Sequence, residues 1–160
     1  MGWTLVLDLD ACSDCTECTV KCAHHWHPRN DAVAALRELA AYAVACRRCE
    51  EKACVNACPN EALEAGEDGT LVRHNLRCVG CLSCVRACPF GTLFDEVISF
   101  LVGSCDLCGG EGTPPCVENC EKKALQVVEE LPEEAVEVRP GFAAKGRRWV
   151  KVEPKEAART

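Results

Sequence analysis

The chain has 160 residues, 16 of them cysteine, and a formal net charge of −7. The negative charge argues against nucleic acid as a partner, because phosphate backbones select basic surfaces. The sequence has no apolar run long enough to span a membrane and no basic or twin-arginine leader, so we expect neither a transmembrane helix nor a secretory signal.

Short elements are predicted along the chain. Apolar patterning predicts strands at residues 3–9, 62–64, 70–73, 91–94, 98–102 and 124–128. One helix is expected at residues 31–42, where Val33, Leu36 and Leu39 recur at helical spacing after Asp31, a candidate N-cap. Residues 66–69, Gly-Glu-Asp-Gly, indicate a turn between two of the strands. Because large apolar residues are few, something else must fill the centre of the molecule.

The cysteines fall into four groups of four, and none is left over. Group one is Cys12, Cys15, Cys18 and Cys22; group two is Cys46, Cys49, Cys54 and Cys58; group three is Cys78, Cys81, Cys84 and Cys88; group four is Cys105, Cys108, Cys116 and Cys120. Groups one and three read CxxCxxCxxxC, and the middle gap is wider in groups two and four. This density of cysteine indicates disulfides or bound metal.

Iron–sulfur clusters explain the spacing better than zinc does. A structural zinc site usually takes its ligands from two CxxC pairs that are roughly a dozen or more residues apart. Three cysteines at three-residue intervals instead suit a loop around a larger cubane. The sequence therefore predicts four [4Fe–4S] clusters, whose charge would bring the protein to roughly −15. A mixed iron and zinc protein stays an alternative, as does a [3Fe–4S] centre or another metal in group four.

Groups two and three together resemble a small bacterial two-cluster ferredoxin. Both groups continue into proline, at Pro59 and Pro89, and nineteen residues separate Cys58 from Cys78. The resemblance implies an α+β fold of two nested ferredoxin-like modules, with short strands and helices around four clusters. We expect an outer module at residues 1–30 and 97–128 and an inner module at residues 31–96. Residues 129–160 are interpreted as a C-terminal arm that binds a partner.

The order of the four groups is similar to that in iron–sulfur electron-transfer subunits of the dimethyl sulfoxide reductase type. This resemblance covers about residues 3–128 and implies that the fourth cysteine of each group serves the other cluster of its pair. The implied ligands are Cys12, Cys15, Cys18 and Cys120 for cluster 1; Cys105, Cys108, Cys116 and Cys22 for cluster 2; Cys46, Cys49, Cys54 and Cys88 for cluster 3; and Cys78, Cys81, Cys84 and Cys58 for cluster 4.

The same resemblance implies a non-catalytic electron-transfer subunit. No Gly-rich nucleotide motif, P-loop or GxSxG accompanies the cysteines, so no catalytic residue is predicted. Members of this type serve molybdenum or tungsten oxidoreductases, such as formate dehydrogenase and aldehyde oxidoreductase, as well as hydrogenases and carbon monoxide dehydrogenases. We expect a catalytic subunit of the molybdenum- or tungsten-pterin class as partner, with a tungsten aldehyde oxidoreductase first.

The other end of the relay is expected to meet a second redox subunit, a ferredoxin or a flavin protein, and self-association is permitted. The lack of an anchor or leader favours a cytoplasmic complex. A free diffusible polyferredoxin is an alternative function, and a zinc-stapled structural module is another.

Residues outside the cysteine groups are candidates for secondary roles. Seven basic residues near ligands could offset cluster charge: Arg47, Arg48, Lys52, Arg77, Arg86, Lys122 and Lys123. Residues 24–28, His-His-Trp-His-Pro, are interpreted as a surface segment or partner contact, with a second metal site as the alternative. Trp26 and Trp149 could anchor an interface. Alternation at Val136 and Val138 indicates an edge strand in the arm.

Overall fold

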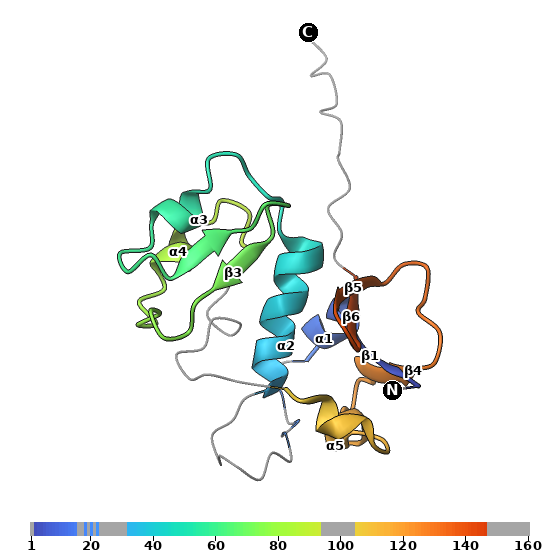
Figure 1. Cartoon of the computed structure of the whole chain (residues 1–160). Helices are drawn as coiled ribbons and strands as arrows, with labels where there is room; N and C mark the ends of the chain where they lie inside the picture. Colours follow the sequence, from blue (N-terminus) through green and yellow to red (C-terminus); the bar gives the residue numbers. More distant parts are fainter. Residues whose placement is uncertain are drawn as a thin grey trace, which may run out of the picture.

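The computed structural model describes residues 2–15, 18, 20, 22, 32–93 and 105–146. Four features singled out in the sequence lie outside these residues: the expected strand at 98–102, the histidine segment at 24–28, the candidate cap Asp31, and Trp149. The described chain has a small mixed α/β fold built around two apolar clusters (Figure 1).

A four-stranded sheet forms the larger part of the fold. Its strands are β1 (Thr4–Asp8), β4 (Leu125–Val128), β5 (Val136–Arg139) and β6 (Phe142–Lys145), in the order β4-β1-β6-β5. Strand β1 pairs antiparallel with β4 and parallel with β6, and β5 pairs antiparallel with β6. The strands expected at residues 3–9 and 124–128 are thus confirmed as β1 and β4.

Strands β5 and β6 complete this sheet, although the sequence placed them in a partner-binding arm. Leu5, Val6 and Leu7 of β1 are all buried, which is the pattern of an inner strand that is covered on both faces. Strand β4 covers one edge of β1 and β6 the other, and Phe142 is fully buried. The strand expected at Val136 and Val138 is confirmed as β5, but it pairs within the chain. Residues 136–145 therefore belong to the same sheet as β1.

Strand β1 leads directly into α1 (Leu9–Ser13), a short helix that carries Cys12. The Asp8 carboxylate accepts hydrogen bonds from the backbone N–H groups of Asp10 and Ala11 at 3.0 and 3.1 Å, which makes Asp8 the N-cap. Sequence reasoning missed this helix because it has little more than one turn.

Helix α2 (Ala32–Ala40) confirms the helix expected from the sequence and lies between the two parts of the fold (Figure 1). Val33, Leu36 and Ala40 belong to the apolar cluster of the outer sheet. The helix continues as a π-helical turn, η1 (Ala41–Ala45), whose Tyr42 is buried in the second apolar cluster. The helix and its extension therefore supply residues to both apolar cores.

The inner part is a hairpin with two short helices. Strands β2 (Leu63–Ala65) and β3 (Leu71–Arg73) pair antiparallel, and the turn between them is closed by a hydrogen bond from Gly69 N–H to the Gly66 carbonyl at 2.9 Å. Helices α3 (Ala53–Asn56) and α4 (Ser83–Ala87) complete this part. Its buried apolar core holds Tyr42, Leu63, Leu71 and Leu93. The strand expected at residues 91–94 is wrong, because 91–93 are irregular and 94 is not described.

Two further elements follow in the outer part, the 3₁₀ turn η2 (Leu107–Gly110) and helix α5 (Pro115–Glu118). Among the helices that the structure describes, none is both long and apolar enough to cross a bilayer.

Candidate metal centres

Cysteine groups two, three and four share one backbone geometry. In each group the residue two places after the first cysteine has a positive φ, at Arg48 (52°), Gly80 (68°) and Leu107 (57°). The third cysteine of each group is the second residue of a short helix, at Cys54 in α3, Cys84 in α4 and Cys116 in α5. The sequence repeat is therefore a structural repeat as well.

The same repeat continues beyond the fourth cysteine of each group. The residue three places later has a positive φ, at Glu61 (49°), Gly91 (64°) and Lys123 (53°). Its N–H donates to the carbonyl of that cysteine at 3.3, 3.3 and 3.0 Å respectively. A positive φ at a non-glycine residue costs about 1–3 kcal/mol, so its recurrence at matching positions indicates a common functional demand.

These turns aim backbone N–H groups at cysteine sulfurs. The N–H of Arg48 lies 3.5 Å from the sulfur of Cys46, and the N–H of Ala62 lies 3.2 Å from the sulfur of Cys58. Burial raises the pKa of Cys88, but N–H groups of Phe90, Thr92 and Leu93 lower it below its ordinary value. Such N–H groups stabilise negative charge on sulfur and tune the potential of a sulfur-bound metal centre.

One pocket of about 450 Å³ gathers four cysteines of the inner part. Cys46, Cys49 and Cys54 line it from group two, and Cys88 lines it from group three. Burial raises the pKa of the Cys54 thiol to about 11, and the Cys88 and Cys46 thiols add to this rise. Thiols that raise one another's pKa need a positive partner in order to ionise together, and bound iron would supply it.

A second pocket of about 300 Å³ gathers four more cysteines. Cys78, Cys81 and Cys84 line it from group three, and Cys58 lines it from group two. Burial raises the pKa of Cys84, with further contributions from the Cys58 and Cys78 thiols. The two pockets thus exchange their fourth cysteines.

The outer cysteines come together in the same crossed manner. Burial raises the pKa of Cys12, and the thiols of Cys18, Cys15 and Cys120 raise it further against the opposing effect of Arg37. Burial likewise raises the pKa of Cys116 to about 11, with further contributions from the thiols of Cys105, Cys108 and Cys22. Cys12 therefore interacts with the fourth cysteine of group four, and Cys116 interacts with the fourth cysteine of group one.

The described residues do not form a mononuclear metal site, since no three His, Cys, Asp or Glu side chains among them converge in that way. No disulfide joins any two of the sixteen cysteines, all of which lie among the described residues. Cys15, Cys18, Cys81 and Cys108 are exposed and the others are half-buried. The donor set is thus sulfur alone, arranged around pockets, which fits sulfur-ligated iron clusters.

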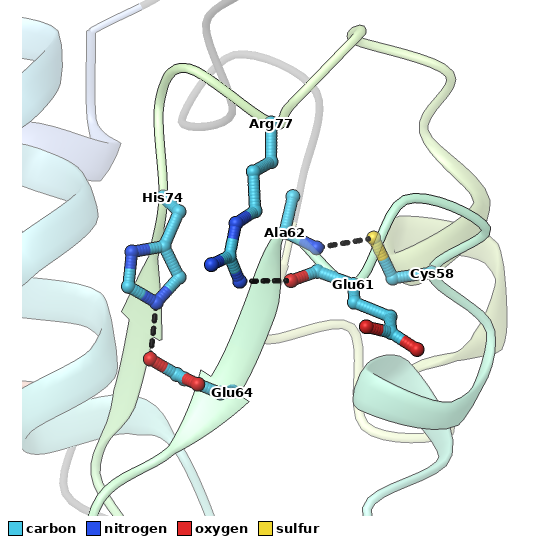
Figure 2. A network of polar contacts seen from close by, with 6 residues as sticks. All are labelled: Cys58, Glu61, Ala62, Glu64, His74 and Arg77. Atoms are coloured by element: carbon cyan, nitrogen blue, oxygen red, sulfur yellow. Dashed lines mark hydrogen bonds and ion pairs between the residues drawn. The ribbon is translucent and has the colours of Figure 1, made fainter.

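Polar contacts fix the segment beside Cys58 (Figure 2). The backbone N–H of His74 donates to the Ala62 carbonyl at 2.7 Å, and the His74 side chain pairs with Glu64. Arg77, a basic residue singled out in the sequence, donates to the Glu61 carbonyl at 3.4 Å. These contacts hold the start of β2 close to Cys58, which lines the second pocket.

The basic residues expected near ligands have different surroundings. Arg47, Arg48 and Lys52 line the first pocket, and the Arg47 guanidinium lies 4.5 Å from the centre of the Phe90 ring. Arg86, Lys122 and Lys123 are exposed.

Sequence reasoning missed Arg73, which forms a buried ion pair with Glu38 of α2 at 2.7 Å. No signal in the cysteine spacing pointed to this pair, because its members are 35 positions apart in the sequence.

Comparison with known proteins places these features in context. A family model described as a 4Fe-4S dicluster domain matches residues 38–130. YsaA of Escherichia coli, named as a candidate electron transport protein, is 37% identical over 146 residues, which cover 81% of this chain and 91% of YsaA. AegA of the same organism, named as a candidate oxidoreductase, is 36% identical over 151 residues, or 82% of this chain and 22% of AegA.

A further relative is a tetrathionate reductase subunit of Salmonella typhimurium. It is 29% identical over 136 residues, which cover 74% of this chain and 54% of that subunit. The chain thus spans about a fifth of AegA, about half of the reductase subunit and nearly all of YsaA.

Proposed function

This chain belongs to the family of 4Fe-4S dicluster proteins, and from that premise we propose that it is an electron-transfer subunit with four [4Fe–4S] clusters. It relays electrons between the catalytic subunit of an oxidoreductase and a second redox partner, and it performs no chemistry on a substrate. The observation that carries the proposal is that each of two pockets is lined by four cysteines, three from one group and one from its neighbour.

The ligand sets follow from this crossing. We assign Cys46, Cys49, Cys54 and Cys88 to cluster 3, and Cys78, Cys81, Cys84 and Cys58 to cluster 4. The outer thiols raise the pKa of one another in the same crossed pattern. This pattern supports Cys12, Cys15, Cys18 and Cys120 as ligands of cluster 1, and Cys105, Cys108, Cys116 and Cys22 as ligands of cluster 2. These ligand sets correspond to a fold of two nested modules, in which groups two and three form the inner module and groups one and four form the outer module.

When bound, each cluster takes up or gives up one electron with little change in geometry. Three short helices carry the third cysteine of groups two, three and four. The backbone also directs N–H groups at the sulfurs of Cys46, Cys58 and Cys88. The exchange of fourth cysteines fixes the separation of the two centres in each pair through covalent bonds.

For the partner, we propose a catalytic subunit of the molybdenum- or tungsten-pterin class, as in the dimethyl sulfoxide reductase type, with a tungsten aldehyde oxidoreductase first. The likeness to a subunit of a tetrathionate reductase supports a place within an oxidoreductase complex. The likeness to a fifth of AegA supports the same place, because there the matching segment is part of a longer chain named for an oxidoreductase. We propose a cytoplasmic location, because reducing conditions there keep cysteines available as cluster ligands.

One observation favours a second function, that of a free diffusible carrier. The match to YsaA extends over 91% of that protein, which is named for electron transport and has no large additional part. Size-exclusion chromatography of native, anaerobically prepared material separates the two functions. Elution with a catalytic chain supports the subunit, whereas recovery only as a monomer supports the carrier.

The cluster assignment is tested by iron and sulfide analysis together with Cys120→Ser. Wild-type protein should hold about sixteen irons, as four [4Fe–4S] clusters require. Because Cys120 is proposed to serve cluster 1, its replacement should perturb the signal that Cys15→Ser also perturbs. If it instead perturbs the signal affected by Cys108→Ser, the crossed ligand sets are wrong.

A further inference from the structure

Arg73, at the end of β3, carries a buried positive charge, and its side chain interacts with Cys78, a residue that lines the second pocket. Its side chain is 7% exposed, and Nε and Nη2 donate to the two carboxylate oxygens of Glu38 at 2.7 and 2.8 Å. The remaining nitrogen, Nη1, is buried and has no hydrogen-bond partner among the described residues. A buried N–H group without a partner is unfavourable, so this position calls for an acceptor.

The proposed cluster ligand that interacts with this guanidinium is Cys78. Burial lowers the pKa of Arg73, but Glu38 and then the Cys78 side chain raise it above its ordinary value. Cys78 packs against the apolar core that contains Tyr42 and Leu71, and Tyr42 in turn interacts with both Glu38 and Arg73. Glu38, Tyr42, Arg73 and Cys78 therefore form one contiguous group, which reaches the second pocket at Cys78.

The surroundings of Arg73 make its charge effective. An exposed cation such as Arg86 is screened by water and salt, whereas a buried guanidinium acts through a medium of low polarity. The bidentate contact from Glu38 also fixes the orientation of the planar guanidinium. Hydrogen bonds to ligand sulfurs and nearby charge are the levers that set the potential of an iron–sulfur centre.

We propose that Arg73 is a positioning residue for cluster 4, which Glu38 holds so that Nη1 donates to the Cys78 sulfur and raises the reduction potential of that cluster. This rests on the proposed function, because it requires a cluster at Cys58, Cys78, Cys81 and Cys84. The electron arrives from one redox partner and leaves to the other, and no bond to Arg73 is made or broken. Donation from Nη1 favours the reduced form, because the added electron increases the negative charge on sulfur.

The test is anaerobic film voltammetry of the full chain, with iron and sulfide counted for each variant. The double variant Glu38→Met/Arg73→Met removes both charges together and leaves neither stranded, so the fold should persist. It should lower the equilibrium constant for reduction of one centre by about tenfold, which is about 59 mV for one electron. Glu38→Gln, which keeps Arg73 and removes the opposing charge, should shift the same centre in the opposite direction.

Two further variants identify the affected centre and control for charge. Cys81→Ser alters a ligand assigned to cluster 4, so the wave it changes should be the wave that the Glu38 and Arg73 variants move. Lys122→Met removes an exposed positive charge in group four and should leave that wave in place.

Three results would contradict the assignment of Arg73. The first is a double variant that keeps its full iron content while the wave assigned to cluster 4 does not move. The second is an equal shift of every wave in that variant. The third applies if the double variant loses iron: an unmoved wave in Glu38→Gln would then overturn the proposal. Wild-type protein without iron or sulfide would instead refute the proposed function itself.

Discussion

Replacing Phe142 with alanine tests whether β6 is an integral part of the fold. The side chain is fully buried in the larger apolar cluster, and β6 pairs with the central strand β1. Replacing a buried Phe with Ala removes its apolar contacts and leaves a cavity, at a cost of about 3–5 kcal/mol. For a chain of this size each kcal/mol shifts Tm by about 2–4 °C, so Phe142→Ala should lower Tm by about 6–20 °C.

The assay is far-UV circular dichroism of anaerobic, cluster-loaded protein. All variants are scanned at one heating rate, because loss of clusters makes unfolding irreversible. Leu76→Ala is the matched control, since Leu76 is 98% exposed and its truncation should change stability by about 0.5 kcal/mol or less. If Phe142→Ala and Leu76→Ala melt together, then β6 does not contribute to the core and the sheet order β4-β1-β6-β5 is wrong.

Three other predictions concern packing, charge and metal. Gly146→Ala should lower Tm, because the residue has a φ of +91° and its new Cβ would lie 2.9 Å from a carboxylate oxygen of Asp10; thermal melting measures this, and an unchanged Tm would contradict it. Glu38→Ala should destabilise the fold by about 3–5 kcal/mol by stranding Arg73, whereas Glu38→Met/Arg73→Met should recover most of that loss in the same melts. Removal of iron with a chelator should abolish hydrogen-exchange protection in β3 before β1, because among the described residues the inner core has four buried apolar side chains and the outer core twelve; equal loss in both strands would refute this.

The sequence predicted the parts of the fold that local patterns control. Alternation at β1, β4 and the β2–β3 hairpin, and helical spacing in α2, were each sufficient to identify the element. The cysteine spacing likewise identified the donor set, because the spacing within a group is a local property. The crossed ligand sets came from a resemblance, and they remain a proposal that the pockets support.

What the sequence missed depends on contacts between distant residues. The pairing of β6 with β1 places Phe142 opposite Leu5, and no local pattern in either segment predicts its partner strand. The Glu38–Arg73 pair is equally nonlocal. Positive φ values at Arg48 and Glu61 were hidden for a different reason, since neither residue type favours that conformation. These residues adopt it because the cysteine loops require it at those positions.

Helix α2 and its π-helical extension form one continuous element that is shared by the two apolar cores. Leu36 is locked into one core and Tyr42 into the other, with less than two helical turns between them. Electron tunnelling weakens steeply as its gap lengthens, so a conductor made of two halves works only if the halves keep their distance. Because one continuous helix is packed into both halves, it fixes the distance between them. A flexible hinge at this point would lengthen that distance and slow electron transfer.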